Sequence, residues 1–184
     1  MSKTILRPYQ TKAGLAIRQH TGSGGKGAVL QLATGAGKTA VFCDLLMGAY
    51  AKGKHALMVV KGKALVGQAS ARLTREGVPH GIYQGDNTVD THERILVCSI
   101  DTLYIRRIAP HADLIVVDEC HLSHSDGYKW FLDQYKCFKL GVSATPHHKK
   151  GMRHIGDKLI YPAPFSELVA GGYLVDAKYF VPYI

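Results

Sequence analysis

Residues 28–39 read AVLQLATGAGKT, an apolar run followed at once by a glycine-rich loop. Gly35 and Gly37 carry no side chains, so the backbone there can wrap closely around a phosphate. The amides of such a loop, with the positive end of a following helix, favour an anion. Lys38 can then reach the β- and γ-phosphates of a nucleotide, and the Thr39 hydroxyl can ligate Mg²⁺. The residues predicted to bind the nucleotide here are Thr34, Gly35, Ala36, Gly37, Lys38 and Thr39.

This loop departs at one position from the strict phosphate-loop pattern G-x-x-x-x-G-K-[ST], because Leu32 stands where that pattern has glycine. The alternative interpretation is an ordinary glycine-rich turn between a strand and a helix. Residues 37–39 keep the Gly-Lys-Thr sequence, an apolar run precedes them, and apolar residues at helical spacing follow. These features favour the phosphate loop.

Short apolar runs alternate with helically spaced residues along the rest of the chain. Continuous apolar runs separated by helices predict an α/β fold, with a parallel β-sheet covered by helices on both faces. Ligands in such sheets bind at the carboxyl ends of the strands, so the residues that follow each strand are the candidates for a site. The expected strands are residues 28–33, 56–60, 94–100, 114–117 and 139–142, and the expected helices are about 41–49 and 63–75.

An acidic pair follows the run at residues 114–117, in the tetrapeptide Asp118-Glu119-Cys120-His121. Two carboxylates at the end of a buried strand are costly unless they meet a cation or water. Asp118 suits Mg²⁺, through a water, and Glu119 is then placed to polarise the water that attacks a γ-phosphate. Two alternatives are a surface acidic turn and a zinc site formed by Cys120, His121 and His124, which lacks the second half that structural zinc sites use.

A third polar segment, Ser143-Ala144-Thr145-Pro146, follows the run at 139–142. Its two hydroxyl groups could form hydrogen bonds to His121, and the alternative is a plain turn. The loop 146–154 is rich in Lys, Arg and His, and we expect it either to contact phosphate or to be solvated.

Composition narrows the class of protein. The chain has 184 residues, of which 46% are hydrophobic and 20% charged, a balance typical of one globular domain. The longest apolar run is five residues, Ala56–Val60, too short for a membrane span or a signal peptide. Four cysteines without close spacing favour reduced thiols. Lys and Arg exceed Asp and Glu by 23 to 14, and the net charge of +9 suggests a polyanionic partner.

The three motifs together, in this order, resemble the superfamily-2 helicases and translocases, and the sequence DECH resembles their DExH-type members. The start LRPYQ at residues 6–10 is similar to that of bacterial and phage DNA-repair and recombination helicases. The resemblance implies a RecA-like P-loop NTPase domain that uses ATP and Mg²⁺. It implies catalytic roles for Lys38, Asp118, Glu119 and His121, adenine recognition by Gln10 with Arg7, Mg²⁺ binding by Thr39 and Asp118, coupling through Ser143 and Thr145, and nucleic-acid contacts by Lys61, Lys63, Gln68, Ser99 and Thr102.

The resemblance also sets expectations for domains and partners. Residues 1–172 are expected to form the first RecA-like domain, and 173–184 to begin a linker to a second RecA-like domain that the family needs for its arginine finger. Nucleic acid, DNA more than RNA, is the expected partner, with no membrane, in the cytoplasm of a bacterial or phage-infected cell. The alternatives are a P-loop kinase or GTPase, and a non-catalytic module that binds nucleic acid or a partner.

Overall fold

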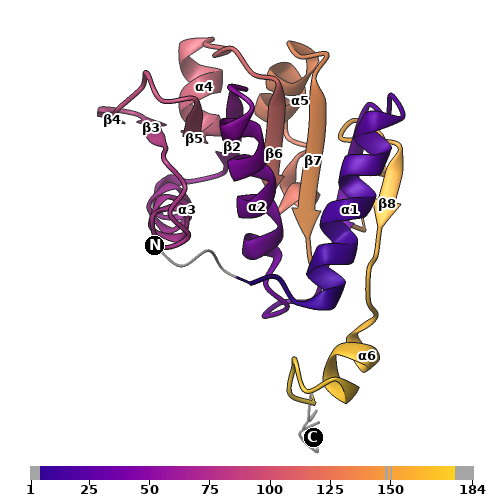
Figure 1. Cartoon of the computed structure of the whole chain (residues 1–184). Helices are drawn as coiled ribbons and strands as arrows, with labels where there is room; N and C mark the ends of the chain where they lie inside the picture. Colours follow the sequence, from indigo (N-terminus) through magenta and orange to yellow (C-terminus); the bar gives the residue numbers. More distant parts are fainter. Residues whose placement is uncertain (1–4, 148, 150, 177–184) are drawn as a thin grey trace, which may run out of the picture.

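A single sheet of eight strands forms the centre of the molecule (Figure 1). The computed structural model describes residues 5–147, 149 and 151–176. The strand order across the sheet is β4-β3-β5-β2-β6-β7-β1-β8. The strands are β1 (Gly27–Gln31), β2 (Ala56–Val60), β3 (Gly81–Gln84), β4 (Asn87–Val89), β5 (Ile95–Ser99), β6 (Leu114–Asp118), β7 (Phe138–Ser143) and β8 (Lys158–Ile160).

Helices cover both faces of this sheet, as the sequence predicted. One face packs against α1, α2 and α3 through a core that includes Ile17, Phe42 and Leu73, and the other packs against α4 and α5 through Leu103 and Phe131. The helices are α1 (Pro8–Gly22), α2 (Lys38–Ala51), α3 (Lys63–Arg75), α4 (Ile100–Arg106), α5 (Asp126–Asp133) and α6 (Phe165–Ala170), with a short 3-10 helix η1 (Cys120–Leu122).

The sheet is parallel except at one edge. β3 and β4 pair antiparallel, with Gln84 opposite Asn87, so only Gly85 and Asp86 join them. Two residues can connect antiparallel strands, whereas parallel strands need a crossover. The prediction of a parallel sheet therefore holds for the pairs formed by β1, β2, β5, β6, β7 and β8, and for β3 with β5.

The register of three adjacent strands brings the predicted motifs together. β7 lies between β1 and β6, with Gln31 opposite Ser143 and Asp118 opposite Val142. The loops that follow these strands therefore start at one level of the sheet. The chain also passes from β1 over to β2, leaving β6 and β7 between them, and ligands of open α/β sheets bind at such a change of strand order.

The segment after α6 packs back against the start of the chain. The rings of Tyr173 and Tyr9 are 5.2 Å apart, and a Cβ at Gly35 would lie 3.2 Å from Cδ2 of Leu174. The first residues of the predicted linker thus contact the domain, while residues 177–184 lie outside the described part of the chain. The boundary at 172 stays a prediction. Among the described residues, no helix is long and apolar enough to cross a membrane.

Candidate functional site

The loop between β1 and α2 has the backbone of a phosphate cradle. Gly35 and Gly37 have φ angles of +81° and +76°, in the left-handed region that favours glycine. A Cβ at Gly37 would lie 2.3 Å from Nε2 of Gln10, so a larger residue would not fit the loop as it stands. This geometry is compatible with a bound phosphate at the start of α2.

The structure gives a reason for Leu32 at the position where the strict phosphate-loop pattern has glycine. Its side chain is fully buried in the core between the sheet and α2, so a leucine serves there for packing. Its backbone oxygen accepts a hydrogen bond from Nζ of Lys38 at 3.2 Å. The lysine is thereby held over the loop.

Lys38 and the acidic pair lie close enough to affect one another. Burial lowers the pKa of Lys38, and the charges of Glu119 and Asp118 oppose that shift. Burial likewise raises the pKa of Asp118. The hydrogen bond from the Glu119 backbone opposes that rise, the charge of Glu119 adds to it, and the charges of Arg72 and Lys38 oppose it. The opposite charges thus compensate in part for the burial of each group.

Glu119 adopts an unusual backbone conformation, with φ +47° and ψ +51°. A residue with a side chain rarely occupies this region, and such strain is concentrated at functional positions. The turn allows the amide of Glu119 to donate to Oδ1 of Asp118 at 3.0 Å. The carboxylate of Asp118 is therefore fixed against the backbone of Glu119 at the tip of β6.

His121 joins the segment after β6 to the segment after β7. Its Nδ1 lies 3.3 Å from Oε2 of Glu119 and 3.0 Å from Oγ of Ser143. The Ser143 hydroxyl also accepts the backbone N–H of Thr145 at 3.1 Å. The bridge that the sequence suggested is present for Ser143, while Thr145 takes part through its backbone.

The two residues predicted at the adenine have partners within the protein. Gln10 is 4% exposed, and its amide donates to the carbonyl of Ala36 at 3.0 Å and accepts from the backbone of Arg7 at 2.9 Å. The guanidinium of Arg7 lies 5.2 Å from the centre of the Tyr173 ring. Gln10 thus connects α1 to the phosphate loop, and its contact with adenine stays a prediction.

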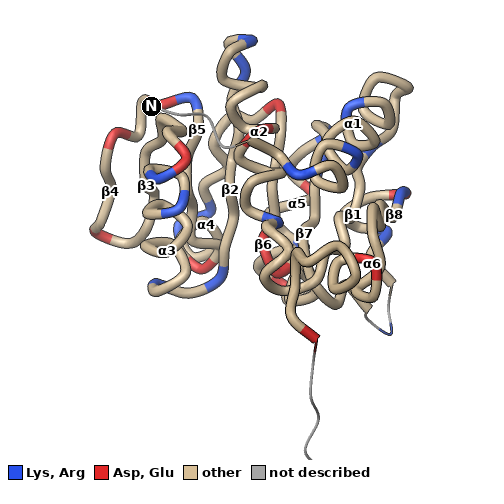
Figure 2. Tube along the Cα trace, turned by 60° about the horizontal axis from the view of Figure 1, so that its bottom comes forward, with Lys and Arg blue, Asp and Glu red and all other residues tan. Residues whose placement is uncertain are grey.

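The five predicted nucleic-acid residues fall into two groups. Lys61, Lys63 and Gln68 are exposed at the start of α3. Ser99 and Thr102 are buried, and the Thr102 hydroxyl accepts the backbone N–H of Gly85 at 2.9 Å. A phosphate contact by these two side chains would need a change of conformation. Figure 2 shows Lys and Arg spread over several elements rather than gathered on one.

Cys120 lies in the core rather than at a metal site. It is fully buried, and a Cβ at Gly141 would come within 2.9 Å of its Sγ. No group of three potential metal ligands occurs among the described side chains of His, Cys, Asp and Glu. Of the basic loop 146–154, residues 148 and 150 lie outside the described part.

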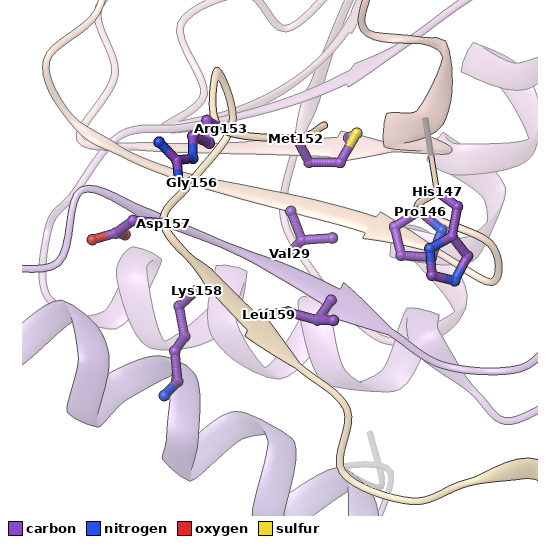
Figure 3. A pocket seen from close by; sticks show the side chains of 9 residues that line it. All are labelled: Val29, Pro146, His147, Met152, Arg153, Gly156, Asp157, Lys158 and Leu159. Carbon is purple, nitrogen blue, oxygen red and sulfur yellow. The ribbon is translucent and has the colours of Figure 1, made fainter. Parts of the chain in front are cut away.

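A separate hollow of about 500 Å³ lies over β1 and β8, away from the phosphate loop (Figure 3). Val29 and Leu159 line its base, and Met152, Arg153 and His147 lie around it. It contains none of the residues predicted to bind a nucleotide, so we do not assign the nucleotide to it.

Arg72 is a charged residue of this region that the sequence interpretation missed. Its Nη1 lies 3.9 Å from Oδ2 of Asp118. Arg72 follows Gln68 by four residues on α3, and that spacing was the available signal. Whether Arg72 reaches Asp118 depends on how α3 is rotated about its own axis, and the residues that α3 buries against the sheet set that rotation.

A phosphate loop after β1 and an acidic pair after β6, on either side of β7 at one edge of a parallel sheet, define a RecA-like P-loop NTPase. The chain belongs to the family described as type III restriction enzyme, res subunit, whose model matches residues 3–148. It is a first RecA-like domain of the superfamily-2 helicase class, as the resemblance predicted.

Comparison with known proteins supports this placement. The chain is 30% identical, over 97% of its length, to the "Putative ATP-dependent helicase IRC3" of Saccharomyces cerevisiae, of which it spans 29%. Two solved structures share the fold. The UvsW helicase of bacteriophage T4 is 18% identical, with a TM-score of 0.71 over 85% of this chain and 60% of that one. The SWI2/SNF2 ATPase core of Sulfolobus solfataricus, solved in complex with dsDNA, is 19% identical, with a TM-score of 0.69 over 83% of this chain and 35% of that one.

Proposed function

We propose that this chain is the ATP-binding half of a motor that couples ATP hydrolysis to movement along DNA, or to its unwinding. The observation that carries the proposal is the placement of Lys38, Asp118 and Glu119 at one edge of the sheet, beyond the tips of β1 and β6 on either side of β7, where the charges of the two carboxylates act on Lys38. A cation and two carboxylates beside a glycine-rich loop suit a nucleotide that carries its own metal ion.

The residues divide the work by their chemistry. The ammonium of Lys38 binds the terminal phosphates, and the loop amides from Thr34 to Thr39 surround them. Glu119 accepts the proton of the attacking water, since its carboxylate is half-exposed and can be reached by a water. Nδ1 of His121 contacts both Glu119 and Ser143, so a change at the phosphates can reach the end of β7 through this ring nitrogen.

The donor set also fits Mg²⁺. Asp118 supplies a carboxylate oxygen and Thr39 a hydroxyl at the start of α2, and Mg²⁺ prefers oxygen ligands and keeps several waters. When bound, the ion would neutralise charge that develops on the phosphates. The magnesium assignment rests on this chemistry alone.

A nucleic acid and a second RecA-like domain complete the proposal. DNA is favoured because the chain carries a net charge of +9 and because a structural neighbour was solved with dsDNA. An arginine finger from another domain accelerates related reactions by about 10³–10⁵. The chain by itself is therefore expected to hydrolyse ATP very slowly. Two further predictions stay predictions: the division into a domain at residues 1–172 and the start of a linker at 173–184, and a cytoplasmic location in a bacterial or phage-infected cell. The relative named above is a yeast protein.

Single-turnover hydrolysis of ATP tests the function. We expect a slow rate that depends on Mg²⁺ and is lost in Lys38→Ala, with binding of ATP preferred over GTP. Equal rates in the variant and the wild type would contradict the assignment of the site. Strong selectivity for GTP would favour a GTPase, and fast DNA-stimulated turnover by this chain would contradict the need for a second domain.

A further inference from the structure

Arg72 lies between the acidic pair and the predicted nucleic-acid residues of α3. Its Nη1 is 3.9 Å from Oδ2 of Asp118. The Asp118 side chain is 17% exposed and that of Arg72 is 45% exposed. The carboxylate is therefore mostly shielded, while the arginine keeps a large part of its surface in solvent and can change its position without disturbing the core.

The two carboxylate oxygens of Asp118 have different partners. Oδ1 accepts the backbone N–H of Glu119 at 3.0 Å, and Oδ2 faces Arg72. A magnesium ion held by Asp118, directly or through a water, would add a second cation at the carboxylate that Arg72 faces. The metal ion and the guanidinium group would therefore compete for one carboxylate.

The geometry of α3 places Arg72 beside a predicted nucleic-acid contact. Val66, Ala69 and Leu73 are buried and fix which side of the helix faces the sheet. Gln68 and Arg72 are four residues apart, and side chains at this spacing are neighbours on a helix. A guanidinium that leaves Asp118 thus stays next to Gln68.

We propose, on the basis of the function given above, that Arg72 is a positioning residue that pairs with Asp118 in the nucleotide-free chain and moves to a nucleic-acid phosphate beside Gln68 when Mg²⁺–nucleotide binds. Two cations at one carboxylate repel each other, and Mg²⁺ carries twice the charge of the guanidinium. Nucleotide binding then adds one phosphate contact. By linkage, nucleic acid raises the affinity for Mg²⁺–nucleotide by the same factor.

The first test is the Mg²⁺ requirement for binding a fluorescent, non-hydrolysable ATP analogue. Arg72→Gln removes the competing cation, so half-maximal binding is expected at roughly fivefold less Mg²⁺, the lower end of usual couplings between sites. Arg75→Gln is the matched control, because Arg75 is an exposed arginine on the same helix, and it should behave like wild type. Arg72→Lys restores a cation and should return the requirement toward the wild-type value.

The second test is the salt dependence of binding to duplex DNA, measured without nucleotide and with Mg²⁺ and the same analogue. In wild type and Arg75→Gln, the slope of log K against log salt should steepen by about one on nucleotide binding, the value for one added phosphate contact. In Arg72→Gln it should not change.

A higher Mg²⁺ requirement in Arg72→Gln would overturn the inference, since Arg72 would then be a ligand of the nucleotide. Equal behaviour of Arg72→Gln and Arg75→Gln, with analogue binding that still depends on Lys38, would overturn this inference alone. Binding of the analogue that does not depend on Lys38 would instead overturn the proposed function.

Discussion

The tips of β1, β6 and β7 differ sharply from the tip of β2. At the first group, Lys38, Glu119, His121 and Ser143 contact one another or the backbone through the bonds described above. Beyond β2, Lys61 and Lys63 are exposed, and neither side chain forms a hydrogen bond or ion pair with another described residue. The nucleotide side is arranged before its ligand arrives, whereas the predicted nucleic-acid side beyond β2 offers exposed charge.

The difference indicates what each side recognises. A fixed arrangement of donors and carboxylates can distinguish a triphosphate from other anions, because its geometry is set in advance. Exposed lysines neutralise phosphates without reading bases, so they supply affinity and not sequence preference. We therefore expect mutations at the two sides to affect different measured quantities.

The largest expected effect is the loss of ATP hydrolysis rate in Glu119→Gln. The variant keeps the size of the side chain but cannot accept a proton, and general base catalysis contributes about 10²–10⁴-fold. Single-turnover hydrolysis should fall by that factor while the affinity for the ATP analogue stays near that of wild type. Glu167→Gln, an exposed position on α6, is the control. An unchanged rate would mean that the fixed region does not perform the chemistry assigned to it.

A pair of glycine substitutions compares the packing of the two regions. In Gly141→Ala on β7, the new Cβ would lie 2.9 Å from Cβ and Sγ of Cys120 and from Cγ2 of Ile155, so we expect a loss of about 1–3 kcal/mol in the free energy of unfolding. Gly67→Ala on α3 meets nothing within 4 Å and should stabilise by about 0.5–1 kcal/mol, since alanine favours a helix. Urea denaturation measures both. Changes of the same sign would show that the two regions are packed alike.

The smallest expected effect is a change in the salt dependence of DNA binding when the exposed lysines are replaced. Lys61→Ala with Lys63→Ala should reduce the slope of log K against log salt for DNA binding by about two, or about one for each phosphate that is no longer neutralised. The affinity for the ATP analogue should not change. Lys12→Ala, an exposed lysine on α1, serves as the control. Equal slopes in the double variant and the control would remove α3 from the nucleic-acid interface.

Local patterns in the sequence were sufficient for part of this fold. Both ends of β2 and α3 agree with the predicted ranges 56–60 and 63–75, because a continuous apolar run and a helical spacing are each clear there. Helix α1 was not predicted, since Tyr9, Ala13 and Ile17 provide a thin buried stripe in a polar segment. The short strands β3, β4 and β8 depend on pairing with distant segments, which no local pattern encodes.

The same division applies to the site. Residue types at the strand ends were enough to predict that Lys38 and Asp118 lie at one edge of the sheet, where the charge of each acts on the pKa of the other. The burial of Thr102 and the approach of Arg72 to Asp118 depend on how helices rotate against the sheet. Those interactions are tertiary, and no local pattern of residues specifies them.

The central claim is that Lys38 and Asp118 bind one Mg²⁺–nucleotide together. A double-mutant cycle measures this directly, through calorimetric titration of the non-hydrolysable ATP analogue with Mg²⁺ into wild type, Lys38→Ala, Asp118→Asn and the double variant. We predict a loss of affinity in the double variant that is at least about fivefold smaller than the product of the two single losses, as for residues that share a ligand. Losses that simply multiply would contradict the account, because the two residues would then act independently.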